Sequence, residues 1–225
     1  MTMTLQGRLL EVGPTDNTSD QRTPRKRLRL IPQAARESFV PYIPQQAVTR
    51  QGENDLTRIA PGAPRAQGTP IEVSGRVCTQ TGQPVRHALL EIWNANMFGR
   101  YTHIEDHSGI QLDPNFLGLG RVTTDDEGRY TFWTISPGAY LARPDIGRYR
   151  PKHIHISLSG GSSRLITQMY FPGEENNATD PMATLMGDAF ERNVGQVYET
   201  PHIDVHHGYR FDIVVGGRNA TFFED

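Results

Sequence analysis

The 225-residue chain carries 23 basic and 25 acidic residues, and its formal net charge of −2 excludes the single-signed field typical of partners of nucleic acid or anionic membranes. This length suits one well-buried domain plus an extended arm. The single cysteine, Cys78, excludes an internal disulfide and a cysteine-based zinc site, which fits a reducing compartment. Because no signal peptide and no apolar run of about 18 residues stands out, we predict a cytoplasmic protein.

Residues 1–70 are predicted to form a Pro-rich N-terminal arm. Most of this segment combines proline, glutamine and arginine without a sustained period of 3.6 or 2. The basic stretch TPRKRLRL at 23–30 could bind nucleic acid, but its interleaved Leu28 and Leu30 favour a packed surface segment. The folded domain is therefore assigned to residues 71–225.

From residue 71 onward, short apolar runs alternate with turn signals such as TGQP, DDEG and SPGAY. Strands are predicted at residues 71–78, 87–93, 120–124, 129–135, 153–158, 164–170 and 209–215. Strands at this short spacing indicate a mostly β fold, an antiparallel β-sandwich or barrel, and we expect a sandwich core. One short helix is predicted within 180–195, with Asp180 as N-cap, Pro181 at its first position and Gly195 near its end.

The stretch RPKHIHISLSG at 150–160 places two histidines one residue apart. Successive side chains of a strand point to opposite faces, so His153 and His155 share one face and Ile154 lies on the other. Their Cα atoms would lie roughly 6.5 Å apart, which lets two imidazoles bind one ion. The pattern also fits two strand histidines held only by hydrogen bonds, since no Cys/His zinc spacing and no His-Glu-x-x-His motif accompanies it.

Two tyrosines at turn edges could complete a metal site. Tyr101 follows NANMFGR, and Tyr140 ends SPGAY. Either one alone is more commonly a core or interface residue. A phenolate is nevertheless a hard anionic donor, and a strong Lewis acid can hold it deprotonated far below its normal pKa of about 10. Two such ligands favour Fe(III) over zinc.

Five segments between residues 71 and 216 resemble the intradiol aromatic-ring-cleaving dioxygenases, most closely their protocatechuate-type branch. The matching segments are GRVCTQTGQPVRHALLEIWNANMFGRYTH, LDPNFLGLGRVTTDDEGRYTFWTISPGAY, RPKHIHISLSG, LITQMYFPG and GYRFDIVV. The resemblance implies a β-sandwich fold and one non-haem Fe(III). The ligands that it implies are Tyr101, Tyr140, His153 and His155. It also implies that Arg150 and Gln168 act beside the metal.

The activity that the resemblance implies is insertion of both atoms of O₂ into a catechol-type aromatic to give a cis,cis-muconate-type diacid. Protocatechuate, a substituted catechol or hydroxyquinol would be the substrate. Tyr140 would leave the metal and accept a proton from the substrate. Arg150 would stabilise the ketonised, carbanion-like substrate, and Gln168 would orient it.

The predicted substrate pocket is where the sequence departs from the family pattern. Trp93 matches a tryptophan that lines the cavity in the family. Leu141 and Ala142 stand where the protocatechuate-type pattern has a tryptophan-containing stretch, so a bulky wall is missing or supplied differently. The residues assigned to substrate binding are Trp93, Ala142, Met182 and Tyr42.

Two other hypotheses stay open at this stage. In a cupin-like zinc or Fe(II) protein, His153 and His155 would join a carboxylate and a distant histidine. In a ring-cleavage complex, the chain could instead be a non-catalytic or differently metallated subunit, although retention of all four ligands argues against this. A homo-oligomer is the expected assembly, and a hetero-oligomer with a homologous alpha-type subunit is the alternative.

Overall fold

The computed structural model describes residues 2–5, 8–11, 52–103, 106, 108–159 and 164–224. Tyr42 and most of the predicted arm lie outside these residues. Near the N-terminus, β1 (Thr2–Leu5) pairs with β2 (Arg8–Glu11) in an antiparallel sheet. Among the helices that the structure describes, none is both long and apolar enough to cross a membrane.

One layer of the fold is a four-stranded antiparallel sheet in the order β10-β9-β4-β5. Its strands are β4 (Leu89–Trp93), β5 (Leu119–Thr123), β9 (His153–Ser159) and β10 (Arg164–Tyr170). Strand β9 lies in the middle, paired with β4 on one side and with β10 on the other. Both neighbours therefore place side chains beside the two histidines of β9.

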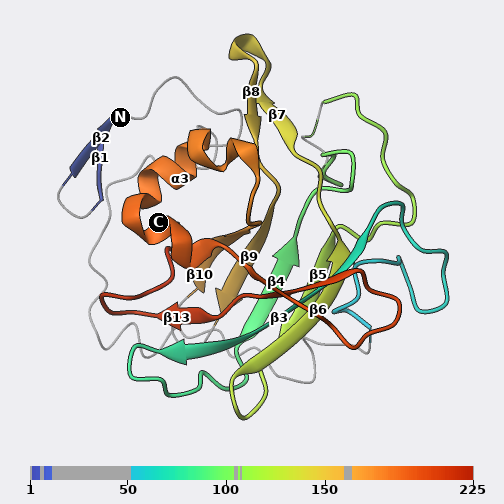
Figure 1. The fold of residues 1–225 in the computed structure, drawn as a ribbon, viewed down its shortest axis with the longest axis horizontal. Helices are drawn as coiled ribbons and strands as arrows, with labels where there is room; N and C mark the ends of the chain where they lie inside the picture. Colours follow the sequence, from blue (N-terminus) through green and yellow to red (C-terminus); the bar gives the residue numbers. More distant parts are fainter. Residues whose placement is uncertain are drawn as a thin grey trace, which may run out of the picture.

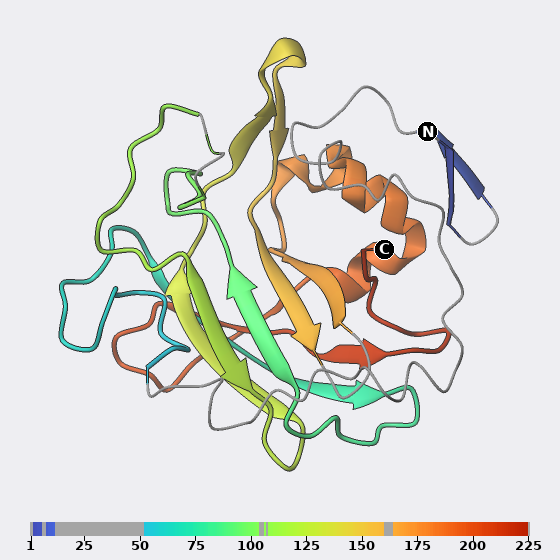
Figure 2. The same ribbon diagram turned by 180° about the vertical axis from the view of Figure 1, so that it is seen from behind.

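The second layer is a mixed sheet in the order β11-β12-β3-β13, with β6 also pairing with β3. Its strands are β3 (Pro70–Thr79), β6 (Arg129–Ile135), β11 (Gln196–Tyr198), β12 (His207–Arg210) and β13 (Ile213–Val215). Strands β12 and β13 run parallel to β3, whereas β6 runs antiparallel to it. Figures 1 and 2 show the two layers from opposite sides. The prediction of a mostly β sandwich is confirmed.

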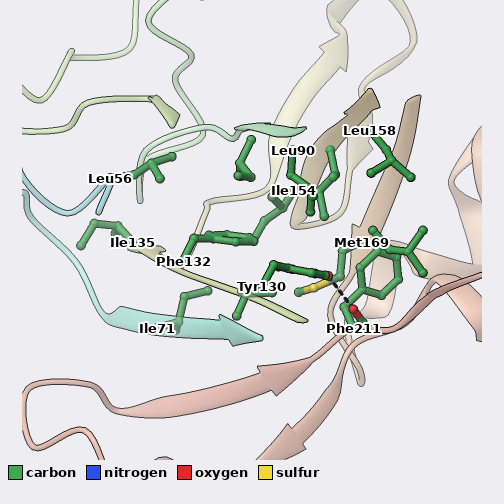
Figure 3. Close-up of a cluster of buried hydrophobic side chains, with 14 of the residues drawn as sticks. Leu56, Ile71, Leu90, Tyr130, Phe132, Ile135, Ile154, Leu158, Met169 and Phe211 are labelled. Atoms are coloured by element: carbon green, nitrogen blue, oxygen red, sulfur yellow. Dashed lines mark hydrogen bonds between the residues drawn. The ribbon is translucent and has the colours of Figure 1, made fainter. Parts of the chain in front are cut away.

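The hydrophobic core is formed by the alternate residues of both layers that point inward (Figure 3). From the first layer, Leu90, Ile154 and Met169 are fully buried, and from the second Ile71 and Phe132 are buried against them. Each such side chain stabilises the fold by about 1.5–3 kcal/mol through removal of apolar area from water. Since the even-numbered residues of β9 face this core, its odd-numbered histidines must face away from it.

A second two-stranded sheet forms a hairpin that extends beyond the body of the protein (Figures 1 and 2). Strand β7 (Tyr140–Arg143) pairs antiparallel with β8 (Arg148–Arg150), and the 3₁₀ helix η1 (Pro144–Ile146) lies between them. Neither strand was predicted from the sequence. The hairpin matters for the site because its base carries Tyr140 and Arg150.

The helical segment follows β10 and comprises η2 (Glu175–Thr179), α3 (Pro181–Met186) and η3 (Gly187–Asn193). The predicted N-cap is confirmed, because the Asp180 carboxylate accepts a hydrogen bond from the Met182 N–H and Pro181 occupies the first turn. The single helix predicted to reach residue 195 is wrong in extent. The α-helix ends at Met186 because Gly187 has φ of 52°, and the segment continues as 3₁₀ helix.

Two predicted strands need correction. The strand predicted at 87–93 begins at Leu89 because His87 has a positive φ of 56° and belongs to a turn. The strand predicted at 209–215 is two strands, β12 and β13, separated at Phe211 and Asp212. The other five predicted strands are present with ends shifted by no more than one residue.

Residues 52–69, which fall within the predicted arm, pack against the sandwich. Leu56 is fully buried, and its N–H donates a hydrogen bond to the carbonyl of Trp133 in β6. Ala66 is also buried in the same core. The division of the chain at residue 70 stays a prediction.

Candidate metal centre

The outward face of β4, β9 and β10 carries a row of functional side chains. Directly opposite residues of antiparallel strands lie on the same face, and the register pairs Trp93 with His155 and His155 with Gln168. One step along, His153 pairs with Tyr170. The sheet alone therefore brings together five side chains that are separated by up to 77 positions in the sequence.

Three of the four predicted ligands place their donor atoms at the spacing of adjacent ligands on one ion. The Nε2 atoms of His153 and His155 are 3.2 Å apart, and the Tyr101 hydroxyl lies 3.3 Å from Nε2 of His153. Two donors that are each about 2.1 Å from a metal, at tetrahedral to octahedral angles, are separated by about 3.0–3.4 Å. The donor set therefore fits a single metal ion.

Tyr140, the fourth predicted ligand, lies beside the other three. Its ring is perpendicular to that of Tyr101 with centroids 5.4 Å apart, and its centroid is 5.7 Å from that of His153. Tyr140 begins β7 and is paired with Arg150 at the end of β8. The hairpin thus places one oxygen donor and one guanidinium at the edge of the histidine pair.

A tight turn before Tyr101 brings this residue against Tyr140. Asn96 closes the turn, since its side-chain oxygen accepts hydrogen bonds from the N–H groups of Phe98 and Arg100. Gly99 has φ of 84°, and a Cβ there would lie 2.6 Å from the carbonyl oxygen of the residue before Tyr140. Only glycine allows this approach of the two chain segments. The Tyr101 N–H is then held by the Asp106 carboxylate at 2.8 Å.

His153 is oriented as a neutral metal ligand. Its Nδ1 lies 2.7 Å from the Pro151 carbonyl oxygen, which can only accept, so Nδ1 carries the proton and Nε2 is left with its lone pair. Burial lowers the pKa of His153 well below its usual value, and the charge of Arg150 lowers it further. The imidazole is therefore neutral and can donate to a cation.

The two tyrosines differ in their electrostatic surroundings. Burial, and next the proximity of Tyr140, raise the pKa of Tyr101 well above its ordinary value. Burial also raises the pKa of Tyr140. The charge of Arg150 opposes the rise in the pKa of both tyrosines, but it is the largest effect after burial only for Tyr140, where a hydrogen bond with Arg150 adds to it. Without a cation both phenols are protonated, so their use as anionic ligands requires a strong Lewis acid.

Arg150 is anchored on the side of the site that faces the helical segment. Its Nε donates to Asp180 at 2.9 Å, and its Nη2 donates to Gln168 at 2.7 Å and to the Tyr170 hydroxyl at 2.9 Å. Burial of the guanidinium disfavours its charge, but Tyr140 and Asp180 outweigh that effect and raise the pKa of Arg150. The side chain is thus a fixed cation beside the predicted ligands.

The four residues predicted to bind substrate lie in different parts of the chain. The Trp93 ring stacks on His155 with centroids 4.9 Å apart and planes 1° apart. Ala142 lies in β7 of the projecting hairpin, and Met182 lies in the first turn of α3. Tyr42 falls outside the described residues. Trp93 is therefore the only one of these that the structure places in ring contact with a predicted ligand.

Three residues of the cluster were not assigned to the site from the sequence: Tyr170, Asp180 and Glu224. Tyr170 could have been found, because it lies two positions after Gln168 on a predicted strand and must share its face. Asp180 was predicted only as a helix cap. Glu224 accepts a hydrogen bond from the Gln168 side chain, and it follows a loop whose path no periodic pattern indicates.

The ligands that a cupin-like metal site would need are not found together among the described residues. Across residues 52–103, 106, 108–159 and 164–224, no group of three or more His, Cys, Asp or Glu side chains is arranged to hold a metal ion. The site is instead defined by two imidazoles and two phenols on a β-sandwich. This donor set is the class of site that the hard Fe(III) ion prefers.

Comparisons with known proteins identify the family of the chain. A family model described as "Dioxygenase" matches residues 41–217. The chain is 40% identical to the protocatechuate 3,4-dioxygenase beta chain of Burkholderia cepacia, over 95% of this chain and 92% of that one. It is 29% identical to the protocatechuate 3,4-dioxygenase alpha chain of Pseudomonas putida, over 88% and 98% of the two chains.

A solved structure of catechol 1,2-dioxygenase from Acinetobacter sp. ADP1 superposes with a TM-score of 0.55 at 25% identity. The match covers 74% of this chain and 58% of that chain, so the present chain spans less than two thirds of that relative. The family match and the 40% identity over nearly the whole length are decisive. The chain belongs to the intradiol ring-cleaving dioxygenases.

Proposed function

We propose that the chain binds one Fe(III) and uses it to cleave a catechol-type aromatic ring between its two hydroxyl-bearing carbons. The ligands in this proposal are Tyr101, Tyr140, His153 and His155. The observation that supports it is that Nε2 of His153 lies 3.2 Å from Nε2 of His155 and 3.3 Å from the Tyr101 hydroxyl, with a second phenol beside them. Fe(III) at this position would hold the phenolates deprotonated and bind the two oxygens of the substrate as a Lewis acid.

In this proposal the protein supplies one of the two proton acceptors that the substrate needs, and solvent supplies the other. A catechol must lose two protons to bind through both oxygens. The Tyr140 phenolate can accept one of them, because the charge of Arg150 offsets part of the effect of burial on its pKa. For Tyr101 the charge of Arg150 is a smaller effect on the pKa than the opposing one of Tyr140, and the backbone N–H of Tyr101 is held by Asp106. We therefore assign proton transfer to Tyr140 and permanent ligation to Tyr101.

Arg150 and Gln168 would act on the substrate rather than on the metal. A fixed guanidinium stabilises negative charge that develops on the ring carbon as the catecholate takes on its keto form. The Gln168 carboxamide is 2% exposed and is bonded to Arg150 through its oxygen, so its NH₂ group points to Glu224. Gln168 would thereby orient Arg150 and the substrate together.

Protocatechuate is the first substrate that we propose, because the relative of highest identity described above is a protocatechuate 3,4-dioxygenase beta chain. Trp93, stacked on His155, would form one wall of the pocket. Ala142 and Met182, which we also propose for this pocket, carry small or flexible side chains, so a substituted catechol or hydroxyquinol stays a second possibility for the same site.

The test is to purify the chain, load it with iron and measure both its visible spectrum and its oxygen uptake. Charge transfer from tyrosinate to Fe(III) should give a reddish protein. Oxygen uptake is then compared with protocatechuate, catechol, hydroxyquinol and gallate. A colourless protein that binds stoichiometric zinc would overturn the metal assignment. A coloured protein without uptake on any of the four would overturn the substrate class but not the metal.

For the assembly, we propose a homo-oligomer located in the cytoplasm. Two relatives are named as beta and alpha chains, so a hetero-oligomer is the competing assembly. Native mass measurement of the chain expressed alone distinguishes the two. A monomer that gains activity only when an alpha-type chain is added would exclude the homo-oligomer.

A further inference from the structure

Asp180 is the buried anion against which Arg150 is held. Its carboxylate is fully buried, and the Arg150 side chain is 13% exposed. Nε of Arg150 donates to Oδ2 at 2.9 Å, and Nη2 lies 3.3 Å from Oδ1. This two-point contact fixes both the position and the plane of the guanidinium, which a single hydrogen bond would leave free to rotate.

The same carboxylate also fixes the start of the helical segment and a neighbouring phenol. Oδ1 accepts a hydrogen bond from the Met182 N–H at 2.7 Å, and the Tyr170 hydroxyl lies 3.3 Å from it. Tyr170 in turn donates to Gln168 at 3.0 Å. One buried side chain therefore connects Arg150, Gln168 and the first turn of α3.

Stability alone does not account for this ion pair. Removing two charges from water is costly, and replacement of a buried ion pair by apolar groups is often neutral or stabilising. Such a pair is useful where a charged group must be held in one place. Arg150 also interacts with Tyr140, through a hydrogen bond and through its charge. The pair thus lies between the helix and the predicted metal ligands.

We propose that Asp180 is a positioning residue of the active site, which holds the Arg150 guanidinium at the edge of the metal centre. The proposal rests on the proposed function, because Arg150 has a catalytic role only if the substrate binds at this centre. It goes further in assigning a role to a residue that is not among the proposed ligands and that acts through Arg150. A displacement of about 1 Å in a catalytic group can cost about 10²-fold in rate.

The primary test is Asp180→Asn in the iron-loaded chain. Asparagine keeps the size of the side chain and an oxygen that can cap α3, but it loses the charge and one acceptor for Arg150. We expect kcat to fall on the order of 10²-fold with an unchanged visible spectrum and iron content. The matched control is Asp188→Asn, the same substitution at an exposed position of η3, which should leave kcat unchanged. A kcat of Asp180→Asn within twofold of the parent would overturn the proposal.

A second variant covers the case in which Asp180→Asn does not fold. Asp180→Glu retains the buried ion pair but adds one methylene group, so it displaces the guanidinium without leaving a charge unpaired. We expect this variant to bind iron with the parent spectrum and to lose kcat. Unchanged turnover would show that the position of the carboxylate is immaterial and would also overturn the proposal.

Two further measurements separate positioning from a general loss of structure. When Arg150→Lys is already present, adding Asp180→Asn should lower kcat by a further factor of less than about three, because both changes act through one group. Fully multiplicative losses would contradict this. In the metal-free protein, the Arg150 Nε–H signal in nuclear magnetic resonance should exchange slowly with water, and Asp180→Asn should remove this protection while Asp188→Asn retains it.

The outcome also distinguishes this inference from the proposed function. If the parent chain takes up no oxygen with any catechol, the proposed function fails, whereas the Arg150 Nε–H measurement still tests whether Asp180 holds the guanidinium. If the parent is active and Asp180→Asn is equally active, the proposed function stands and the role of Asp180 is excluded.

Discussion

Tyr101 and Tyr140 carry the same phenol, but their neighbours give them different chemistry. Burial raises the pKa of both, and the charge of Arg150 opposes this in both. For Tyr140 a hydrogen bond with Arg150 lowers the pKa further, whereas for Tyr101 the nearby Tyr140 raises it further. Tyr140→Phe should therefore lower kcat by about 10²-fold or more, the contribution typical of a general base, and should shift the visible band. Tyr149→Phe, a half-exposed position of the same hairpin, is the control and should change neither. Unchanged spectrum and turnover in Tyr140→Phe would exclude this residue as a ligand.

For single residues, the sequence predicted the face of a strand on which a side chain lies better than it predicted which residue that side chain contacts. Strand alternation is enough to place His153 and His155 on one face, and the structure brings their Nε2 atoms to 3.2 Å. Alternation gives no information on which distant segment lies opposite. The contact of Arg150 with Asp180 joins residues 30 positions apart, with β9, β10 and η2 between them in the chain. For that reason the sequence suggested only a cap at Asp180.

Among the elements, β3 is central to the second layer because β6, β12 and β13 all pair with it. Gly75 is the position of β3 with the least space for a side chain. The chain crosses β3 between β12 and β13, and the Phe211 carbonyl oxygen would lie 1.9 Å from a Cβ at Gly75. The Tyr130 hydroxyl donates to the same carbonyl, as Figure 3 shows. Gly75→Ala should therefore reduce the free energy of unfolding by about 3 kcal/mol through overpacking against backbone.

Chemical denaturation with and without the substitution measures this loss. Gly82→Ala is the matched control, since nothing lies within 4 Å of its Cβ and only its positive φ opposes the change. That strain costs about 1–2 kcal/mol. If the two alanine variants lost equal stability, the close packing of Phe211 on β3 would not be the constraint.

Elements with a regular alternation and clear turn signals were predictable, whereas short polar ones were not. The stretch from Tyr140 to Arg150 contains four charged residues, a proline and a glycine within 11 positions, which is typical of a loop. Its two strands are stabilised by pairing with each other rather than by an apolar face. The split of β12 from β13 was unpredictable for a related reason, because it depends on Gly75 in another strand.

For the molecule as a whole, the core and the candidate metal centre lie on opposite faces of one sheet. Ile154 and Ile156 face the sandwich core, which consists of apolar side chains from both layers. His153 and His155 face the hairpin and the turn before Tyr101. Since the core is closed without the site, the metal-free chain should fold. The metal should then stabilise the folded state by joining the loop of Tyr101, the hairpin and β9.

The size of that stabilisation follows from linkage. A ligand present at 1,000 times its dissociation constant, and bound only by the folded state, contributes about 4 kcal/mol. In a chain of this length, 1 kcal/mol shifts Tm by about 2–4 °C, so iron loading should raise Tm by roughly 10 °C. Removal of iron with a chelator should reverse the shift while the far-ultraviolet circular dichroism keeps its β signal. His153→Gln, which removes one imidazole from the predicted ligand set, should show the same Tm with and without iron. An equal Tm for the metal-free and iron-loaded parent would mean that the four side chains do not bind the ion together, whatever colour the protein has.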